Sequence, residues 1–135
     1  MAFVIDASIA LAWCFEDEAS QKADDILSRL DDEEGVAPSI WPLEVANGLR
    51  SAERRGRIDE QEVPGVARLL ATLPIDVVPT ALDQALGDVL SLARAAGLTT
   101  YDAAYLDLAL RRGLPLATAD EFLARAAAAT GVELV

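Results

Sequence analysis

The sequence contains no histidine and only one cysteine (Cys14) and one lysine (Lys22) among its 135 residues. Without histidine, Ser-His-Asp and Cys-His catalysis and histidine-based acid-base chemistry are excluded. The same shortage excludes the usual zinc sites, which are built from Cys and His. Carboxylates are plentiful, with 23 Asp and Glu against 11 Lys and Arg. Any catalytic or metal chemistry should therefore rest on aspartate and glutamate.

Long apolar runs are also absent, and no segment approaches the roughly 18 to 20 residues that a membrane helix needs. The hydrophobic share of 53% argues against disorder, and the length suits one domain over residues 1–135. A single cysteine forms no internal disulfide, and no basic region precedes the first apolar stretch. We expect a soluble protein without a secretory signal or a membrane segment, located in the reducing cytoplasm.

The net charge of −12 restricts the choice of partners. Such a surface repels phosphate backbones, so nucleic-acid binding would require bound cations or a local basic patch. The same charge favours a basic protein partner.

Apolar runs alternate with helical patterns along the whole chain, which predicts an open α/β fold with helices on both faces of the sheet. We expect three layers (α/β/α) around a central, mostly parallel, five-stranded sheet. The predicted strands are residues 3–6, 35–39, 74–79, a segment within 114–120, and 132–135. The predicted helices are residues 7–15, 19–31, 42–56, 59–72, a long helix from 80 to near 97, 101–113 and 121–131.

Four carboxylates stand at the ends of predicted elements. Asp6 and Asp120 each follow a predicted strand, and parallel strands place such residues at one edge, where ligands bind. Asp102 opens a helix and shares a mostly apolar face with Tyr105, so its charge needs partners. Glu44 lies in a first helical turn, with the polar Asn47 on the same side. The sheet rule directs these four carboxylates to one place.

Taken singly, each carboxylate also has a purely structural explanation. Aspartate caps helix N-termini, because its oxygens accept free backbone N–H groups, and a first-turn glutamate is usually solvated. Caps need not converge, however. If these four do, their mutual repulsion requires a divalent cation such as Mg²⁺ or Mn²⁺, which prefers oxygen ligands and can activate water for attack on a phosphodiester.

Motifs over nearly the whole chain resemble those of the PIN domain in the form carried by VapC-type toxins. They are "VIDAS" at the start, "PLEVANGL", "LTTYDAAYLDLALRRG" and "LPLATAD", in the order and spacing of that family. The resemblance implies a PIN-like fold and a metal-dependent ribonuclease with Asp6, Glu44, Asp102 and Asp120 in its acidic site. It also implies that Asp6, Asp102 and Asp120 hold the metal, with Ser8 and Thr118 beside them and Asn47 supporting the cleft near Glu44.

The resemblance also implies partners: a cognate antitoxin whose basic segment enters the acidic site, and a second copy in a homodimer. Four arginines, which are Arg50, Arg54, Arg55 and Arg57, form the best local patch for RNA, although arginines at a helix end are often only solvated.

Three other residues call for an interpretation. Asp107 stands where the family has a neutral residue, and because it follows Asp102 by five positions we expect it on another helix face, in solvent. Trp13 and Trp41 could stack on bases, but their apolar neighbours favour core or interface positions.

Two other functions remain open. One is phosphoryl transfer through an aspartyl phosphate, which usually needs a lysine late in the chain, whereas Lys22 lies early. The other is a non-catalytic α/β binding module, or a PIN scaffold that has lost its activity.

Overall fold

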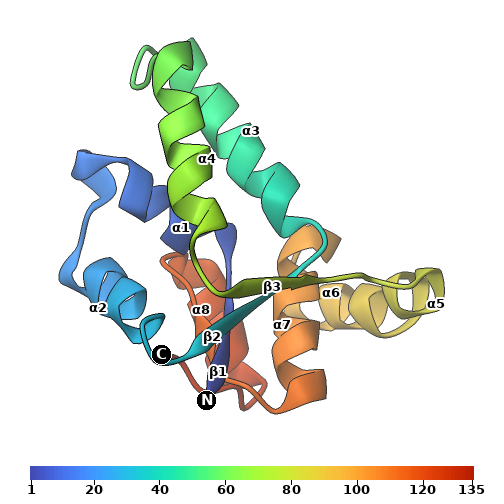
Figure 1. The fold of residues 1–135 in the computed structure, drawn as a ribbon. Coiled ribbons are helices and arrows are strands. Elements are labelled where there is room, and N and C mark those ends of the chain that lie inside the picture. Colours follow the sequence, from blue (N-terminus) through green and yellow to red (C-terminus); the bar gives the residue numbers. More distant parts are fainter.

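The computed structural model describes residues 1–135, and its centre is a parallel sheet. The strand order is β3-β2-β1-β4, so β1 lies inside the sheet between β2 and β4 (Figure 1). The residues of β1 beyond Ala2 are fully buried, which explains why the first strand is a continuous apolar run. The strands are β1 (Ala2–Ile5), β2 (Glu34–Pro38), β3 (Ile75–Val78) and β4 (Leu116–Ala117).

The sheet has four strands, so the prediction of five was wrong. The predicted last strand, residues 132–135, makes only one isolated parallel bridge, between Leu116 and Leu134. Backbone hydrogen bonds from Leu116 to Glu133 and from Val135 to Leu116 hold it there. The partner strand β4 is only two residues long, so it offers too short a ladder for a fifth strand.

The helices occupy the segments between and after the strands. The predicted long helix before residue 97 is present as three consecutive pieces, α5, a π-helical segment η3 and α6, and it ends at Gly97 with a positive φ of 67°. The helices are α1 (Ala7–Cys14), α2 (Gln21–Arg29), α3 (Trp41–Arg54), α4 (Val63–Ala71), α5 (Leu82–Gln84), η3 (Ala85–Val89), α6 (Leu90–Ala96), α7 (Thr100–Arg112) and α8 (Glu121–Ala129), with short 3-10 turns η1 (Glu16–Glu18) and η2 (Glu60–Glu62).

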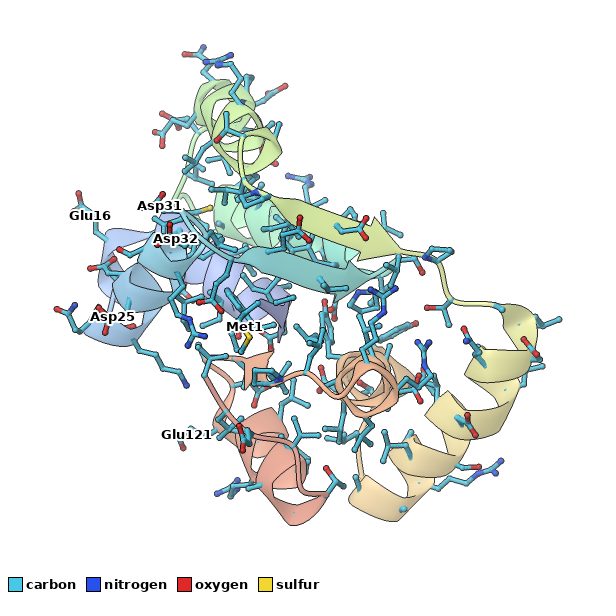
Figure 2. The ribbon with its side chains drawn as sticks, turned by 60° about the horizontal axis from the view of Figure 1, so that its bottom comes forward. Met1, Glu16, Asp25, Asp31, Asp32 and Glu121 are labelled. Atoms are coloured by element: carbon cyan, nitrogen blue, oxygen red, sulfur yellow. The ribbon has the colours of Figure 1, made fainter.

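Helices cover both faces of the sheet, as predicted. Helix α7 packs on β1, β2 and β4, while α1 packs against α2 and α3. Figure 2 shows α7 and α8 on one side of the sheet and α1, α2 and α3 on the other. From β1 the chain moves to β2 and β3 on one side, and β4 lies on the other side of β1. The point between β1 and β4 is therefore the topological switch point, where open α/β sheets bind ligands.

Helix α7 is covered on most of its circumference, because the sheet contacts one side and η3 and α6 contact another. This burial includes Asp107, which is 5% exposed, so the prediction that it faces solvent was wrong. Its carboxylate accepts a hydrogen bond of 2.8 Å from Nε of Arg111, one turn later in the helix. A buried charge needs such a partner.

Both tryptophans belong to the packed interior rather than to an exposed stacking surface. Trp41 is buried in the core, and the half-buried Trp13 donates its indole N–H to the carbonyl of Ala23 at 2.9 Å. None of the helices combines the length and apolar character that a bilayer-spanning segment requires.

Candidate active site

The four carboxylates predicted from the sequence line one cleft of about 280 Å³. They come from four separate places: the end of β1, the first turn of α3, the first turn of α7, and the turn between β4 and α8. The predicted residues Ser8 and Asn47 line the cleft as well, and the full lining is Asp6, Ala7, Ser8, Leu11, Glu44, Asn47, Gly48, Asp102, Tyr105 and Asp120.

Asp6 lies at the bottom of this arrangement, almost completely buried between β1 and α1. Its Oδ1 accepts hydrogen bonds from the backbone N–H and the hydroxyl of Ser8, and it caps α1 through the N–H of Ile9. Its Oδ2 accepts a bond of 2.6 Å from the hydroxyl of the buried Thr118. Asp6 therefore caps α1 and also lines the cleft, so the structural role does not exclude a role in the site.

Burial raises the pKa of Asp6 to about 6. Hydrogen bonds from Ser8 and Thr118 oppose the rise, and the negative charge of Asp120 adds to it. The dominant cause is desolvation of the carboxylate, since a charge is unfavourable away from water. A cation close to Asp6 would offset this cost.

Asp120 is also a helix cap, because its Oδ1 accepts hydrogen bonds from the backbone N–H groups of Phe122 and Leu123 in α8. Its own backbone N–H donates to the hydroxyl of Thr118 at 3.0 Å. Thr118 thereby links Asp120 to Asp6 across the switch point.

Asp102 is not a cap. The N-cap of α7 is Thr99, whose hydroxyl accepts the backbone N–H of Asp102, and the Asp102 carboxylate makes no hydrogen bond within the protein. Burial raises the pKa of Asp102, with further contributions from the charges of Asp120 and Glu44. Its oxygens are therefore held near other carboxylates without any partner that stabilises the charge.

Glu44 contacts a residue that the sequence did not single out for the site. Its Oε1 accepts a hydrogen bond from the hydroxyl of Tyr105, which lies in α7 one turn after Asp102. Burial, followed by the neighbouring Glu44, raises the pKa of Tyr105, so the hydroxyl remains a donor. The signal in the sequence was the i+3 spacing from Asp102, together with the need of a buried tyrosine for a polar partner.

Helices α1 and α3 pack against each other, and both contribute residues to the lining of the cleft. Gly48 makes this close packing possible, because a Cβ on it would collide with the side chain of Leu11. The face of α3 that carries Asn47 and Gly48 therefore lines the cleft, and Gly48 also packs against α1.

The donor set fits a hard divalent cation, because every charged side chain that lines the cleft is a carboxylate. As they stand, however, no three of these carboxylates form a group close enough to hold a metal ion. Asp6, Glu44 and Asp120 are instead turned to hydrogen-bond donors of the protein, as mutual repulsion favours.

Comparison with known proteins gives this arrangement a family. The family model of the PIN domain matches residues 3–129. The chain belongs to the PIN domain family. It is 33% identical over 124 residues to Ribonuclease VapC3 of Pyrobaculum aerophilum, an alignment that covers 92% of this chain and 93% of that protein.

Solved structures support the same fold for this PIN domain. The crystal structure of PAE2754 from Pyrobaculum aerophilum is 26% identical and superposes with a TM-score of 0.69 over 93% of this chain and 87% of that one. A toxin-antitoxin complex from Klebsiella pneumoniae (15% identity, TM-score 0.57, 87% and 86% covered) and FitAcB from Neisseria gonorrhoeae (17%, 0.61, 99% and 96%) share the fold.

The single lysine of this PIN domain lies close to the site but does not line it. Nζ of Lys22, in α2, donates to the backbone carbonyl of Thr118 at 2.8 Å. Although Lys22 lies early in the chain, the fold places its side chain next to the end of β4. It contacts the backbone there, however, and is not among the residues that line the cleft.

The predicted arginine patch is divided in the structure. Arg57 donates to Asp17 at 2.6 Å and to Glu18 at 3.0 Å, and its guanidinium lies 4.4 Å from the centre of the Phe15 ring. Arg50 forms a longer pair with Glu53, at 3.4 Å. The remaining two, Arg54 and Arg55, are exposed and form no ion pair.

Proposed function

We propose that this PIN domain is a metal-dependent endoribonuclease of the toxin type, neutralised by a cognate antitoxin. The observation that carries the proposal is the convergence of Asp6, Glu44, Asp102 and Asp120 on one cleft at the switch point of the sheet. Membership of the PIN family and the likeness to a protein named Ribonuclease VapC3 support it. The proposed activity takes place in the cytoplasm, where its RNA substrate lies.

In this proposal Asp6, Asp102 and Asp120 hold Mg²⁺ or Mn²⁺. When bound, the ion polarises the phosphate and lowers the pKa of a coordinated water. Asp102 has unpartnered oxygens for the ion, and Ser8 and Thr118 fix the orientation of Asp6 through its two oxygens. Glu44, with one oxygen held by Tyr105, accepts a proton from the attacking water or orients it.

The test uses the purified chain without its partner and a mixture of transfer and ribosomal RNAs. Cleavage is measured with Mg²⁺, with Mn²⁺ and with EDTA, beside the variant Asp6→Asn. We expect discrete cleavage products that require the metal and are missing with the variant. If no RNA is cut and the folded protein binds no Mn²⁺ by calorimetry, the carboxylates are only caps and the chain is a binding module.

For the RNA we propose contacts with the exposed Arg54 and Arg55 at the end of α3. They carry positive charge without an acidic partner, whereas Arg57 is held by Asp17 and Glu18. Phosphate contacts by arginine supply most of the affinity for an RNA backbone, and they weaken as salt rises.

The antitoxin partner that we propose is basic. Figure 2 shows acidic side chains projecting from η1, α2 and the turn after α2. All of the labelled acidic residues in this region are exposed, and a cationic segment that continues into the acidic cleft would complement them. These residues are Glu16, Asp25, Asp31 and Asp32.

We also propose that the chain forms a homodimer. Three leucines expose large apolar side chains to solvent: Leu43 (67%), Leu82 (75%) and Leu86 (65%). Leu82 and Leu86 are one turn apart at the start of the helix formed by α5, η3 and α6. Light scattering tests this proposal, and Leu82→Lys together with Leu86→Lys should shift the mass toward the monomer.

A further inference from the structure

Tyr105 is a core side chain whose only polar side-chain atom reaches the acidic cleft. It is 1% exposed and belongs to the main hydrophobic cluster, so packing fixes the position of its ring. The hydroxyl donates to Oε1 of Glu44, which comes from a different helix and is 61 residues away in the chain. A rigid group of α7 thus contacts a flexible group of α3.

Glu44 makes no other side-chain hydrogen bond. It is the acidic residue of the first turn of α3, but the N-terminus of that helix has no side-chain cap, and no cation pairs with the carboxylate. A glutamate side chain has several rotatable bonds, and fixing them costs conformational entropy. The tyrosine hydroxyl is therefore the one group of the protein that holds this carboxylate, and it leaves the second oxygen, Oε2, free.

We propose that Tyr105 is a positioning residue for the reaction in this cleft. By binding Oε1, it keeps the Glu44 carboxylate inside the cleft with Oε2 available to the attacking water. This inference rests on the proposed nuclease function, because it gives Tyr105 its effect through Glu44.

A purely structural role for the hydroxyl predicts a different outcome. A buried hydroxyl needs a hydrogen-bond partner, and a carboxylate on a neighbouring helix would satisfy it without any effect on the reaction. In that case, removal of the hydroxyl would change the stability of the fold and leave the kinetics of the folded enzyme as they are.

The first experiment compares Tyr105→Phe with Tyr101→Phe. Phenylalanine keeps the ring in the core. Tyr101, the other tyrosine of the chain, is 58% exposed on the same helix and does not line the cleft. We expect Tyr105→Phe to lower kcat for RNA cleavage about tenfold at saturating Mn²⁺ with KM for RNA unchanged, because an interaction used after binding has been lost. Tyr101→Phe should behave as the wild type. An unchanged kcat in Tyr105→Phe, or a loss seen equally in Tyr101→Phe, would overturn the proposal.

The second experiment does not depend on activity. Crystal structures of the metal-free wild type and of Tyr105→Phe show where the Glu44 carboxylate lies. We expect it to leave its wild-type position in the variant or to occupy several rotamers, while the ring at position 105 stays in place. A Glu44 side chain unmoved in the variant contradicts the inference. If the wild type cuts no RNA, the nuclease proposal fails, and these structures still decide whether Tyr105 positions Glu44.

Discussion

The hydroxyl of Thr118 donates a hydrogen bond of 2.6 Å to Oδ2 of Asp6, and it joins the ends of two adjacent parallel strands. Thr118 is 1% exposed and also accepts the backbone N–H of Asp120. One buried hydroxyl therefore sets the relative positions of two carboxylates that lie more than a hundred residues apart in the chain.

Replacing Thr118 by valine should weaken both the fold and the site. The substitution keeps the shape of the side chain but leaves a buried carboxylate oxygen and a backbone N–H without their partner. We expect a loss of about 1 to 3 kcal/mol in the free energy of unfolding, measured by urea denaturation, and slower metal-dependent cleavage. Thr72→Val removes an exposed hydroxyl that does not line the cleft, and it should change stability by less than about 0.5 kcal/mol. Equal effects of the two substitutions would show that the link to Asp6 is unimportant.

The contribution of Asp6 to the stability of the metal-free protein should fall as the pH rises. The pKa of Asp6 is about 6 in the folded protein and about 3.8 in the unfolded chain, so the folded state binds more protons between these values. The stabilisation is complete below about pH 4 and is lost above about pH 6. At roughly 1.4 kcal/mol per pKa unit it amounts to at most about 3 kcal/mol.

Urea unfolding in EDTA at pH 4.5 and pH 7.5 measures this loss for the wild type and for Asp6→Asn. The variant carries no charge at this position, so it should gain stability relative to the wild type as the pH rises. A constant difference between the two proteins would contradict the assignment of the raised pKa to Asp6.

Two aspartates of α7 should respond in opposite ways to the same substitution. Asp102→Asn should reduce metal-dependent cleavage about 100-fold or more, because it removes a proposed metal ligand. Its melting temperature without metal should be unchanged or higher, since the Asp102 carboxylate makes no hydrogen bond and lies near Asp120 and Glu44. Asp107→Asn should lose about 1 to 2 kcal/mol of stability, because it breaks the pair with Arg111. The folded Asp107 variant should still cut RNA, and loss of cleavage in both variants would count against the proposed division of roles.

Of the arginines at and after the end of α3, Arg54 and Arg55 should contribute to RNA binding and Arg57 to stability. Arg54→Ala with Arg55→Ala should weaken RNA binding and reduce the slope of log affinity against log salt by about one for each lost phosphate contact. Arg57→Ala should instead lower the melting temperature, because it removes the ion pairs with Asp17 and Glu18. Filter binding over a range of salt concentrations measures the slopes. If Arg57→Ala changes this slope more than the double variant does, RNA contacts Arg57 rather than Arg54 and Arg55, and the proposal is wrong.

A side chain at position 48 should strain the packing of α3 against Leu11 of α1. In Gly48→Ala the new Cβ would crowd the side chain of Leu11, which lines the cleft, so this side chain or α1 must shift. We expect a loss of about 1 to 3 kcal/mol in stability and slower cleavage. In Gly87→Ala the Cβ meets no atom within 4 Å, so this helical glycine is the matched control. Thermal unfolding and cleavage rates of the two variants decide the question.

The acidic cleft could be predicted from the sequence because one general rule connects Asp6 and Asp120. Each follows a short apolar segment that was interpreted as a buried parallel strand, and the carboxyl ends of such strands share an edge. Asp102 and Glu44 were predicted from their positions in the first turns of two helices and from the neighbours that share their helix faces. None of this required side-chain detail, so the four residues could be proposed from the sequence, and the structure then placed them in one cleft.

The errors arose where one element depends on its neighbours. Asp107 was assigned to solvent on the assumption that α7 has one exposed face, yet the sheet and η3 cover most of that helix. The segment 132–135 has strand composition, but β4 is too short to pair with it fully. Arg57 was grouped with its sequence neighbours, whereas its partner Asp17 is 40 residues away. Such pairings do not follow from local pattern.

Tyr105 was missed for a related reason. Its position on the apolar face of α7 was recognised, and its ring is indeed in the core. The hydroxyl, however, reaches Glu44 on another helix. Hydrophobic periodicity assigns a side chain either to the core or to the surface. The ring of Tyr105 lies in the core, whereas its hydroxyl reaches the cleft.

The order of the strands also sets the moment in protein synthesis at which the proposed nuclease can first act. The cleft needs Asp6, which directly follows the first strand of the sheet, and the turn after β4, which follows every other strand. A growing polypeptide on the ribosome would therefore carry Asp6 without a functional site until the residues of β4 and the turn after it have been added.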